Sequence, residues 1–254
     1  MSQTVLVEKN ERGYMKFILH RPEKRNAVSY QLMEEFEAAL DQAAQDNDVK
    51  VVVITGYGDR AFCSGGDLAE FHSLYTEEES YGMLSKMGAI LYKLAVFKKP
   101  TIALLNGSAV GGGCEIASAC DFRLAKSGVK LGFVQASLGI TTGWGGASIL
   151  LEKIPYQSAM KLLLNGTIYT AEAAKELGFI DEVIQGDLEE WERFVDTILN
   201  REVGVLMAYK NLLINKWEET DLKGRMEMES RQCAKLWETD AHHQAVDSFL
   251  NKTK

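Results

Sequence analysis

The sequence predicts an α/β fold that is followed by a helical C-terminal region. Residues 49–55 form a nearly continuous run of β-branched residues, which is typical of a strand buried on both faces of a sheet. Residues 101–105 form a second apolar run, and each run leads into a glycine-bearing turn and then a helical pattern. Beyond residue 187, apolar residues recur almost entirely at helical spacing. This order of elements indicates an α/β core.

The first elements predict a ββαβ arrangement. Residues 4–9 and 14–19 alternate apolar and polar residues on either side of a short polar turn, which indicates a β-hairpin with one buried face. Ser29 is a good N-cap for the helix that follows, in which apolar residues share one face. The strand at residues 49–55 completes the unit.

The later elements continue the alternation and then become helical. Apolar residues from Leu84 to Leu94 fall at helical spacing, and Pro100 ends this helix before the strand at residues 101–105. Two short strands are expected between residues 119 and 134. The helices predicted after them are 144–154, 156–164 and 171–177, then 188–200, 203–217, 224–237 and 240–250. We therefore divide the chain into a core at residues 1–200 and a C-terminal helical region at residues 201–254.

Composition and charge exclude several classes of function. The formal net charge of −8 is spread along the chain, which disfavours a protein that neutralises nucleic-acid phosphates. The apolar runs end well before the roughly 18 residues of a membrane span, and the N-terminus lacks the apolar core of a signal peptide, so we expect a cytoplasmic protein. The four cysteines and four histidines have no metal-binding spacing. We expect reduced thiols, surface histidines and no metal.

Two glycine-bearing segments mark the candidate functional site. They are AFCSGGDL at residues 61–68 and NGSAVGGGCE at residues 106–115, and each lies between a strand and a helix. Without a Cβ atom, backbone amides in such a turn can approach a ligand, and a helix N-terminus directs further N–H groups to the same point. This suits an anionic oxygen, although glycines also simply permit tight turns. Neither segment has the spacing of a Walker A or dinucleotide-binding loop, which disfavours nucleotide chemistry.

Together with three further segments, these turns resemble the crotonase superfamily, also called the enoyl-CoA hydratases/isomerases. The further segments are RPEKRNA at residues 21–27, GITTGWGGASIL at residues 139–150 and TAEAAKELGFIDEVI at residues 170–184, in the order and approximate spacing of that family. The resemblance implies a crotonase-like right-handed spiral of ββα units. It also implies that residues 201–254 are a trimerisation region, in a homotrimer or in a homohexamer built as a dimer of trimers.

The resemblance also implies the residues of the site. The amides of Gly66 and Gly112 match the family's oxyanion hole, which stabilises the enolate formed from an acyl-CoA thioester. The positions that we assign to substrate binding are Lys24, Arg25, Ala27, Ala61, Ser64, Gly65, Asp67, Leu68, Gly111, Gly143 and Trp144. From the residues alone, Lys24 and Arg25 could be solvated charges, and Trp144 could fill the core. We expect no cofactor apart from coenzyme A, which enters as part of the substrate.

Two positions decide the chemistry. Glu115 matches one of two glutamates that hydratases of this family use for proton transfer, and its apolar neighbours in sequence are expected to raise its pKa. In isolation, a glutamate in the first turn of a helix is a favourable partner of the helix dipole. The second glutamate's position falls on Gln135, and an amide cannot take up or release a proton near neutral pH. We predict Glu115 and Gln135 as the catalytic residues, with Gln135 orienting a water molecule.

Three functions follow from these residues. The main prediction is enoyl-CoA hydration, with Glu115 as the one proton-transfer group. The alternative is decarboxylation of a methylmalonyl- or ethylmalonyl-CoA, because loss of CO2 creates the enolate without a general base, and residues 139–148 resemble the ethylmalonyl-CoA decarboxylase branch. A third possibility, of another class, is a member that binds acyl-CoA or RNA without turnover, and the acidic charge weighs against RNA.

Overall fold

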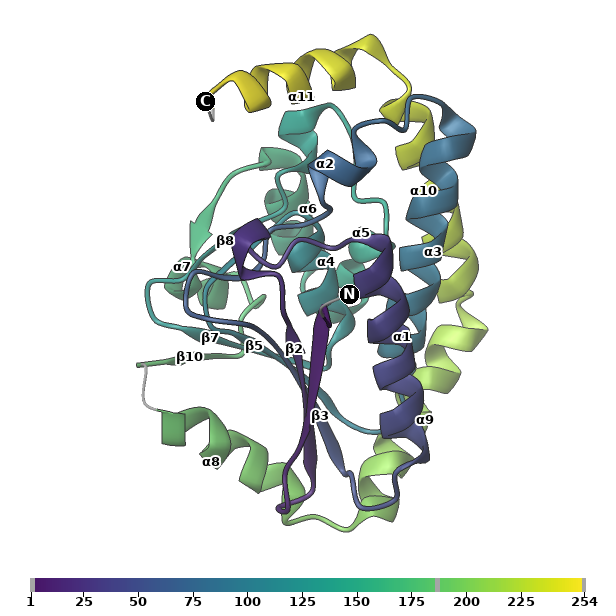
Figure 1. Cartoon of the computed structure of the whole chain (residues 1–254). Helices are drawn as coiled ribbons and strands as arrows, with labels where there is room; N and C mark the ends of the chain where they lie inside the picture. Colours follow the sequence, from purple (N-terminus) through teal and green to yellow (C-terminus); the bar gives the residue numbers. More distant parts are fainter. Residues whose placement is uncertain (1–2, 186–187, 253–254) are drawn as a thin grey trace.

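The structure, a computed structural model, describes residues 3–185 and 188–252. Residues 1–2 and 186–187 of the predicted core and residues 253–254 of the predicted C-terminal region lie outside the described residues. Within the described ranges, a six-stranded sheet runs through the centre of the molecule (Figure 1). In spatial order, its strands are β1 (Val5–Lys9), β2 (Tyr14–Leu19), β3 (Val51–Gly56), β5 (Thr101–Leu105), β7 (Phe122–Lys126) and β10 (Glu182–Ile184). The predicted hairpin is confirmed, because β1 and β2 pair antiparallel, and β2 then pairs in parallel with β3.

A second, smaller sheet lies beside the first. Its strands are β4 (Ala61–Cys63), β6 (Ser108–Val110), β8 (Lys130–Gly132) and β9 (Tyr169–Thr170). Each of the first three follows a strand of the large sheet directly in sequence, and these three run parallel to one another. A helix follows each such pair of strands. The repeated ββα units implied by the sequence resemblance are therefore confirmed.

Helices cover both faces of the large sheet. The helix α1 lies with α3 and α10 on one side, and α8 lies on the other side (Figure 1). Ser29 caps α1 as predicted, since its side chain accepts a hydrogen bond from Leu32 N at 3.2 Å. The helices are α1 (Tyr30–Gln45), α2 (Leu68–Phe71), α3 (Glu77–Ala95), α4 (Gly112–Ala119), α5 (Gly146–Lys153), α6 (Tyr156–Asn165), α7 (Ala171–Glu176), α8 (Leu188–Leu199), α9 (Val203–Glu219), α10 (Leu222–Trp237) and α11 (Asp240–Lys252), with short 3₁₀ turns at Pro22–Lys24 and Gln135–Leu138.

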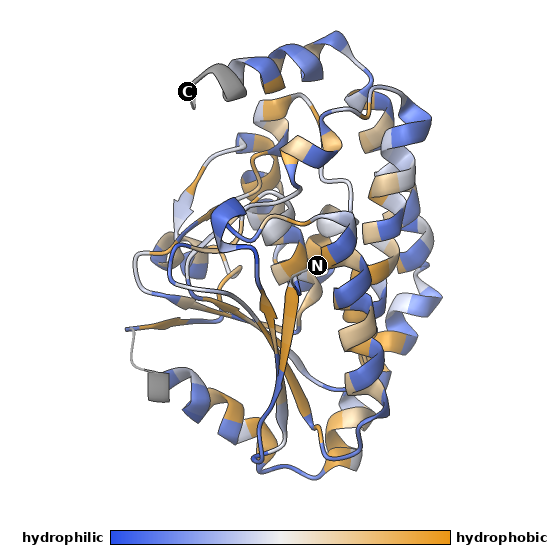
Figure 2. Cartoon of the chain, in the orientation of Figure 1, coloured by the Kyte–Doolittle hydropathy of each residue, from blue (hydrophilic) through white to orange (hydrophobic). Residues whose placement is uncertain are grey.

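The central strand β3 is buried on both faces, as its sequence predicts. Val52 and Ile54 belong to the large apolar cluster on the side of α1 and α3. Val51 and Val53, which alternate with them, belong to a second cluster that α8 closes from the other side. The strands of the sheet are correspondingly apolar along most of their length (Figure 2). Because both faces of this sheet are buried, its strands hold the turns that follow them in fixed positions.

The C-terminal helices pack onto the core of the same chain. The helix α10 runs along α3 and also contacts α5 (Figure 1). Leu222, Met226 and Cys233 of α10 belong to the large apolar cluster. None of the helices in the described ranges is long and apolar enough to cross a membrane.

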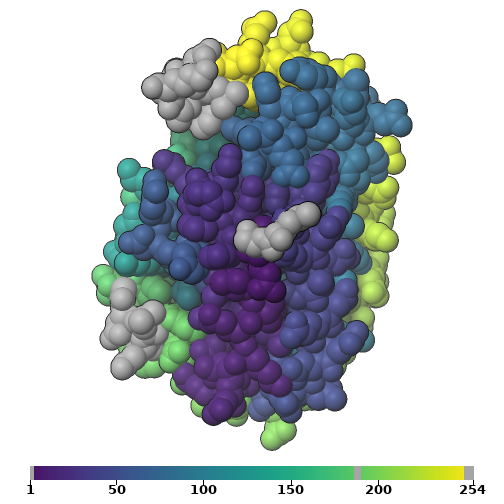
Figure 3. Space-filling view, viewed as in Figure 1, coloured from purple at the N-terminus to yellow at the C-terminus, as the bar shows by residue number. Residues whose placement is uncertain are grey.

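The last helix, α11, corrects one prediction. His242 of α11 is buried, with its ring Nδ1 2.7 Å from the carbonyl oxygen of Leu138, so the histidines are not all on the surface. Its ring also contacts those of Trp237 and His243. In the space-filling view, α11 lies at the upper end of the molecule, above the segment that contains α2 and the start of α3 (Figure 3). The scatter of histidines along the sequence therefore did not show which of them are close in space.

One helix begins later than predicted. Residues 144–154 were expected to be helical, but α5 begins at Gly146. Gly145 has a positive φ of 86°, which is outside the helical region, and the amide of Trp144 donates to a side chain instead of extending the helix. The two residues before α5 are thus held in a specific non-helical conformation beside the candidate site.

We predict opposite effects for alanine at two glycines. A Cβ atom at Gly113 would lie 2.1 Å from the carbonyl oxygen of Cys63, so Gly113→Ala must push α4 away from β4 and lower the free energy of unfolding. Gly82 is on the exposed side of α3 with no atom within 4 Å of such a Cβ, so Gly82→Ala should stabilise the protein by about 0.5–1 kcal/mol. Urea denaturation measures both, and a loss of stability in both variants would contradict this packing.

Candidate active site

The two glycine-bearing turns lie side by side. The strands that lead into them, β4 and β6, pair in parallel, with Cys63 opposite Ala109. The turns therefore leave the same edge of the small sheet. A Cβ atom on Gly65 would lie only 3.3 Å from the backbone nitrogen of Gly112, at the start of α4. The structure thus brings together the two segments that the sequence analysis singled out.

Two backbone amides at this junction have no acceptor. Val28 N donates to Gly65 O and Asp67 N donates to Val28 O, each at 2.8 Å, and these bonds leave the amide of Gly66 between them unused. Gly112 is the first residue of α4, where an N–H group has no partner within the helix. Neither amide donates to any acceptor in the part of the chain that the structure describes. Such a pair of free donors can bind an anionic oxygen.

The packing of Trp144 requires glycine at Gly112, whereas a Cβ atom at Gly66 would be crowded by Phe71, at 3.0 Å. A Cβ atom at Gly112 would lie 2.0 Å from the indole ring, and a Cβ atom at Gly66 would lie 3.7 Å from it. Trp144 is 4% exposed and belongs to the large apolar cluster. Its ring therefore fills the core and also borders Gly112, and its contact with a substrate stays a prediction.

Glu115 lies three residues beyond Gly112 in α4, and its carboxyl group is enclosed. Oε2 accepts hydrogen bonds from Trp144 N at 2.9 Å and Gly146 N at 3.1 Å, and Oε1 accepts one from Gln135 Nε2 at 2.9 Å. Burial raises the pKa of Glu115 to about 8, with a further contribution from the charge of Glu229, although the three donors act in the opposite direction. The predicted upward shift of this pKa is confirmed. A carboxyl group of this kind can exchange a proton near neutral pH.

Gln135 can serve either protonation state of Glu115. Its side chain is 8% exposed, and its Oε1 atom has no hydrogen-bond partner among the described residues. In the present orientation Nε2 donates to Glu115, which suits the carboxylate. Rotation of the amide by half a turn would present Oε1 to Glu115 and let it accept the proton of the neutral acid. An amide therefore fits beside a group that changes its charge.

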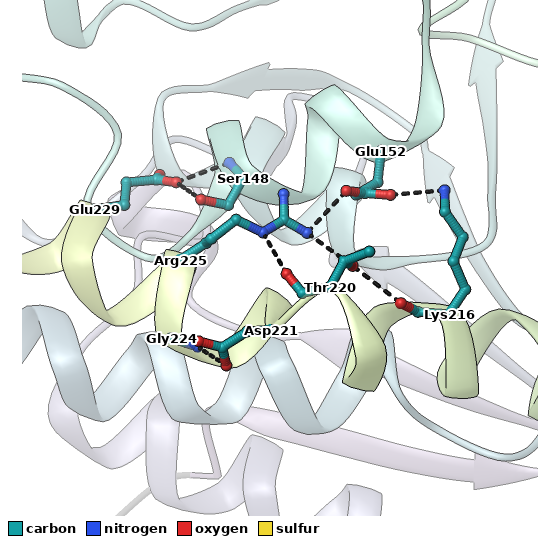
Figure 4. A network of polar contacts seen from close by, with 8 residues as sticks. All are labelled: Ser148, Glu152, Lys216, Thr220, Asp221, Gly224, Arg225 and Glu229. Atoms are coloured by element: carbon teal, nitrogen blue, oxygen red, sulfur yellow. Dashed lines mark hydrogen bonds and ion pairs between the residues drawn. The ribbon is translucent and has the colours of Figure 1, made fainter.

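A second carboxyl group, which the sequence analysis missed, lies close by. Glu229 of α10 accepts hydrogen bonds from Thr142 Oγ1 at 2.5 Å and from Ala147 N at 3.1 Å. It also accepts hydrogen bonds from Ser148 N and Oγ at 2.8 and 2.7 Å (Figure 4). Burial raises the pKa of Glu229 as well. The sequence did contain a signal, because Glu229 continues the buried stripe of Met226 and Cys233 along α10.

Several residues that were predicted to bind coenzyme A lie beside the glycine-bearing turn at residues 61–68. Lys24 and Arg25 are exposed, and their carbonyl oxygens accept hydrogen bonds from Ser64 Oγ at 3.3 Å and Ser64 N at 3.1 Å. Ala27 and Ala61 are buried beside this loop. The structure therefore ties the two cationic residues to the segment that carries Gly66.

Other predicted substrate contacts have structural partners. Asp67 is bound to Arg21 at 2.7 Å and accepts a hydrogen bond from Ala69 N at the start of α2, where Leu68 is the first helical residue. Gly111 precedes α4 with a positive φ of 55°. A Cβ atom at Gly143 would lie 2.6 Å from Leu84 and 2.8 Å from Cys233, so this residue faces α3 and α10.

Comparison with known proteins identifies the family. Residues 9–254 match the family described as Enoyl-CoA hydratase/isomerase. The chain belongs to that family. A crotonyl-CoA hydratase of Syntrophomonas wolfei is 30% identical over 99% of this chain and 96% of its own.

Two further relatives are informative. An ethylmalonyl-CoA decarboxylase of Xenopus laevis is 29% identical over 96% of this chain and 82% of its own. The crystal structure of an enoyl-CoA hydratase from Bacillus anthracis superimposes with a TM-score of 0.80 at 29% identity, covering 98% of this chain and 97% of the other. Members of the hydratase/isomerase family are lyases and related enzymes, so this chain is an enzyme of that type. Among the described residues, no cluster of His, Cys, Asp and Glu side chains could hold a metal ion.

We predict that the Arg21–Asp67 pair stabilises the loop that carries Gly66. Both side chains are largely buried, at 16% and 8% exposure. Arg21→Met leaves the carboxylate of Asp67 without its cation, which should lower the free energy of unfolding by about 3–5 kcal/mol. Lys24→Met, a few residues away on the surface, should change it by less than about 0.5 kcal/mol. Urea denaturation of both variants measures the difference, and equal effects would contradict a stabilising role for the pair.

Proposed function

We propose that this enzyme acts on acyl-CoA thioesters and that enoyl-CoA hydration is its main reaction. The observation that carries the proposal is the pair of free amides, Gly66 N and Gly112 N, next to the enclosed carboxyl group of Glu115. The amides would bind the thioester oxygen, on which negative charge builds when the α-carbon becomes enolate-like. One such donor contributes about 3–4 kcal/mol to stabilising a transition state. The similarity to a crotonyl-CoA hydratase supports the same substrate class.

Coenzyme A would bind at the protein surface, beside the loop that carries Ser64 and Gly66. Lys24 and Arg25 are exposed cations attached to the loop that carries Ser64, and neither forms an ion pair with a described residue. Cations without a partner are available for the phosphates of coenzyme A. Trp144 would border the acyl group, because its ring already lies against Gly112.

In hydration, Glu115 would act alone in proton transfer. As a carboxylate it would take a proton from the attacking water, and it would then return that proton to the α-carbon of the enolate. Gln135, whose Oε1 atom is free, would orient the water. The raised pKa of Glu115 helps both halves, because an acid-base group works best when its pKa is near the working pH.

Decarboxylation is the second candidate, favoured by a specific observation. Glu115, with its pKa raised to about 8, is largely neutral at pH 7 and could donate its proton to an enolate formed by loss of CO2. The similarity to an ethylmalonyl-CoA decarboxylase supports this alternative. The two reactions use opposite starting states of Glu115.

Assembly into a trimer, or into a dimer of trimers, belongs to the same proposal. Val205, Tyr209 and Leu212 lie on one face of α9 and are 51%, 71% and 67% exposed. An apolar face of this kind is typical of a surface that contacts another chain. Residues 201–254 would then serve both the core of their own chain and the contact between copies.

The pH dependence of turnover distinguishes the two reactions. We predict that hydration of crotonyl-CoA becomes faster as the pH rises through about 8, because Glu115 must be ionised to act as a base. Decarboxylation of methylmalonyl- or ethylmalonyl-CoA would become slower over the same range, because Glu115 must be neutral to act as an acid. Loss of enoyl absorbance and release of CO2 measure the two rates.

The control for this experiment is Glu115→Gln, which keeps the hydrogen-bond acceptor but cannot exchange a proton. Turnover should fall about 100- to 10,000-fold in this variant. Glu227→Gln, at an exposed residue of α10, should leave it unchanged. Absence of both reactions in the parent protein would contradict the proposal and favour binding without turnover.

A separate prediction concerns coenzyme A itself. Lys24→Ala and Arg25→Ala should each raise the KM for a CoA thioester by on the order of tenfold, the factor that corresponds to ~1.4 kcal/mol, with little change in kcat. The corresponding thioester of pantetheine, which lacks the phosphates, should show the same KM with parent and variants. An equal rise in KM for both substrates would contradict a phosphate contact.

A further inference from the structure

Two carboxyl groups from different helices share the first turn of α5. The N–H groups at the start of an α-helix have no partners within the helix. Here Gly146 N donates to Glu115, whereas Ala147 N and Ser148 N donate to Glu229. The positive end of one helix is thus divided between the carboxyl group of α4 and the carboxyl group of α10.

The helix α10 also holds the segment that precedes α5. Ser230 Oγ donates to Gly143 O at 2.7 Å, Cys233 Sγ lies 3.2 Å from Thr141 O, and Thr142 Oγ1 donates to Glu229. Further along the same pair of helices, Arg225 donates to Glu152 at 2.8 Å (Figure 4). Residues 141–143 and 147–148 are therefore hydrogen-bonded to α10, on both sides of residues 144–146. This segment includes Trp144 N and Gly146 N, the two backbone donors to Glu115.

The surroundings of Glu229 supply no cation to neutralise it. Its helix contributes Arg225, which is engaged by Glu152, and the thiol of Cys233, and α4 contributes Glu115. The residues of α3 that are buried on this side are apolar apart from Ser80. No ion pair among the described residues includes Glu229. Glu229 is therefore a carboxyl group without a cationic partner, held by four hydrogen-bond donors, beside the proposed proton-transfer group.

We propose that Glu229 is a positioning residue for the reaction of Glu115: it fixes residues 142–148, and so holds the backbone donors Trp144 N and Gly146 N against the carboxyl group of Glu115. This inference rests on the proposed function. Its second effect is electrostatic, since a negative charge nearby disfavours ionisation of Glu115. Glu229 does not touch the substrate in this scheme. It acts through the first turn of α5 and through its charge.

The test uses Glu229→Gln and Glu229→Ala, with Glu227→Gln as the matched control. Glu227 is two residues away on the exposed side of the same helix, where it contacts Arg231 and Tyr81. Infrared spectroscopy of the carboxyl C=O stretch, with Glu115→Gln as the reference, follows the titration of Glu115 without any substrate. Steady-state kinetics with crotonyl-CoA and ethylmalonyl-CoA gives kcat and KM.

We expect Glu229→Gln to move the titration of Glu115 to lower pH by on the order of one unit, because the neighbouring charge is removed while the side-chain shape is kept. The pH profile of kcat should move in the same direction. Glu229→Ala should lower kcat by about 100-fold, with a smaller change in KM, because the donors to Glu115 lose their anchor. Glu227→Gln should change neither quantity.

Three outcomes would overturn the inference. They are an unchanged titration of Glu115 in Glu229→Gln, a change in KM alone, and a fall in melting temperature with unchanged kcat. Ser148→Ala, which removes one donor to Glu229, covers the case in which Glu229→Ala does not fold, and a shift of the Glu115 titration in the same direction but smaller would support the inference. If the parent turns over neither thioester, the proposed function fails, while the infrared titration still decides the role of Glu229.

Discussion

The arrangement of the site depends on the free N–H groups at the start of α5. Helix termini always leave such donors unpaired, and in a buried position they must find acceptors. Here two carboxyl groups satisfy them, one from α4 and one from α10. This single requirement joins the second glycine turn, the segment around Trp144 and the C-terminal helices into one unit. It also explains why an ionisable group can be buried beside the candidate site: its hydrogen bonds are supplied by backbone donors that would otherwise be unsatisfied.

Much of the large sheet could be predicted, because the burial of a strand leaves a recognisable pattern of apolar residues in the sequence. The alternation in β1 and β2 and the unbroken apolar run of β3 correspond to one and two buried faces, and the structure confirms both. The strands β4 and β6 have only three residues each, which is too short for alternation to be distinguished from a turn. Both were included in the predicted glycine-bearing turns, because the periodic pattern gave no sign of them, and the family resemblance implied ββα units without placing these two strands.

The residues of the candidate site likewise divide into those that the sequence predicts and those that it does not. Glu115 and the two glycine turns could be found because their residues are close in sequence and match a family pattern. Glu229 was missed, because its place in the buried stripe of α10 indicates burial but no role, and its role arises from packing between helices that are distant in the chain. The start of α5 was misplaced for a related reason: Gly145 adopts a positive φ, and the amide of Trp144 donates to Glu115, a contact between residues that are distant in the sequence.

The long separation of these contacts also affects how the protein folds. The hydrogen bonds of Glu229 to Thr142 and Ser148 join positions 87 and 81 residues apart. Non-local contacts form late, because the entropy of closing a long loop must be met before they add stability. The sheet and its hairpin can therefore form while α10 is still undocked. The surroundings of Glu115 are complete only once α10 has docked, so the recovery of activity during refolding reports this docking.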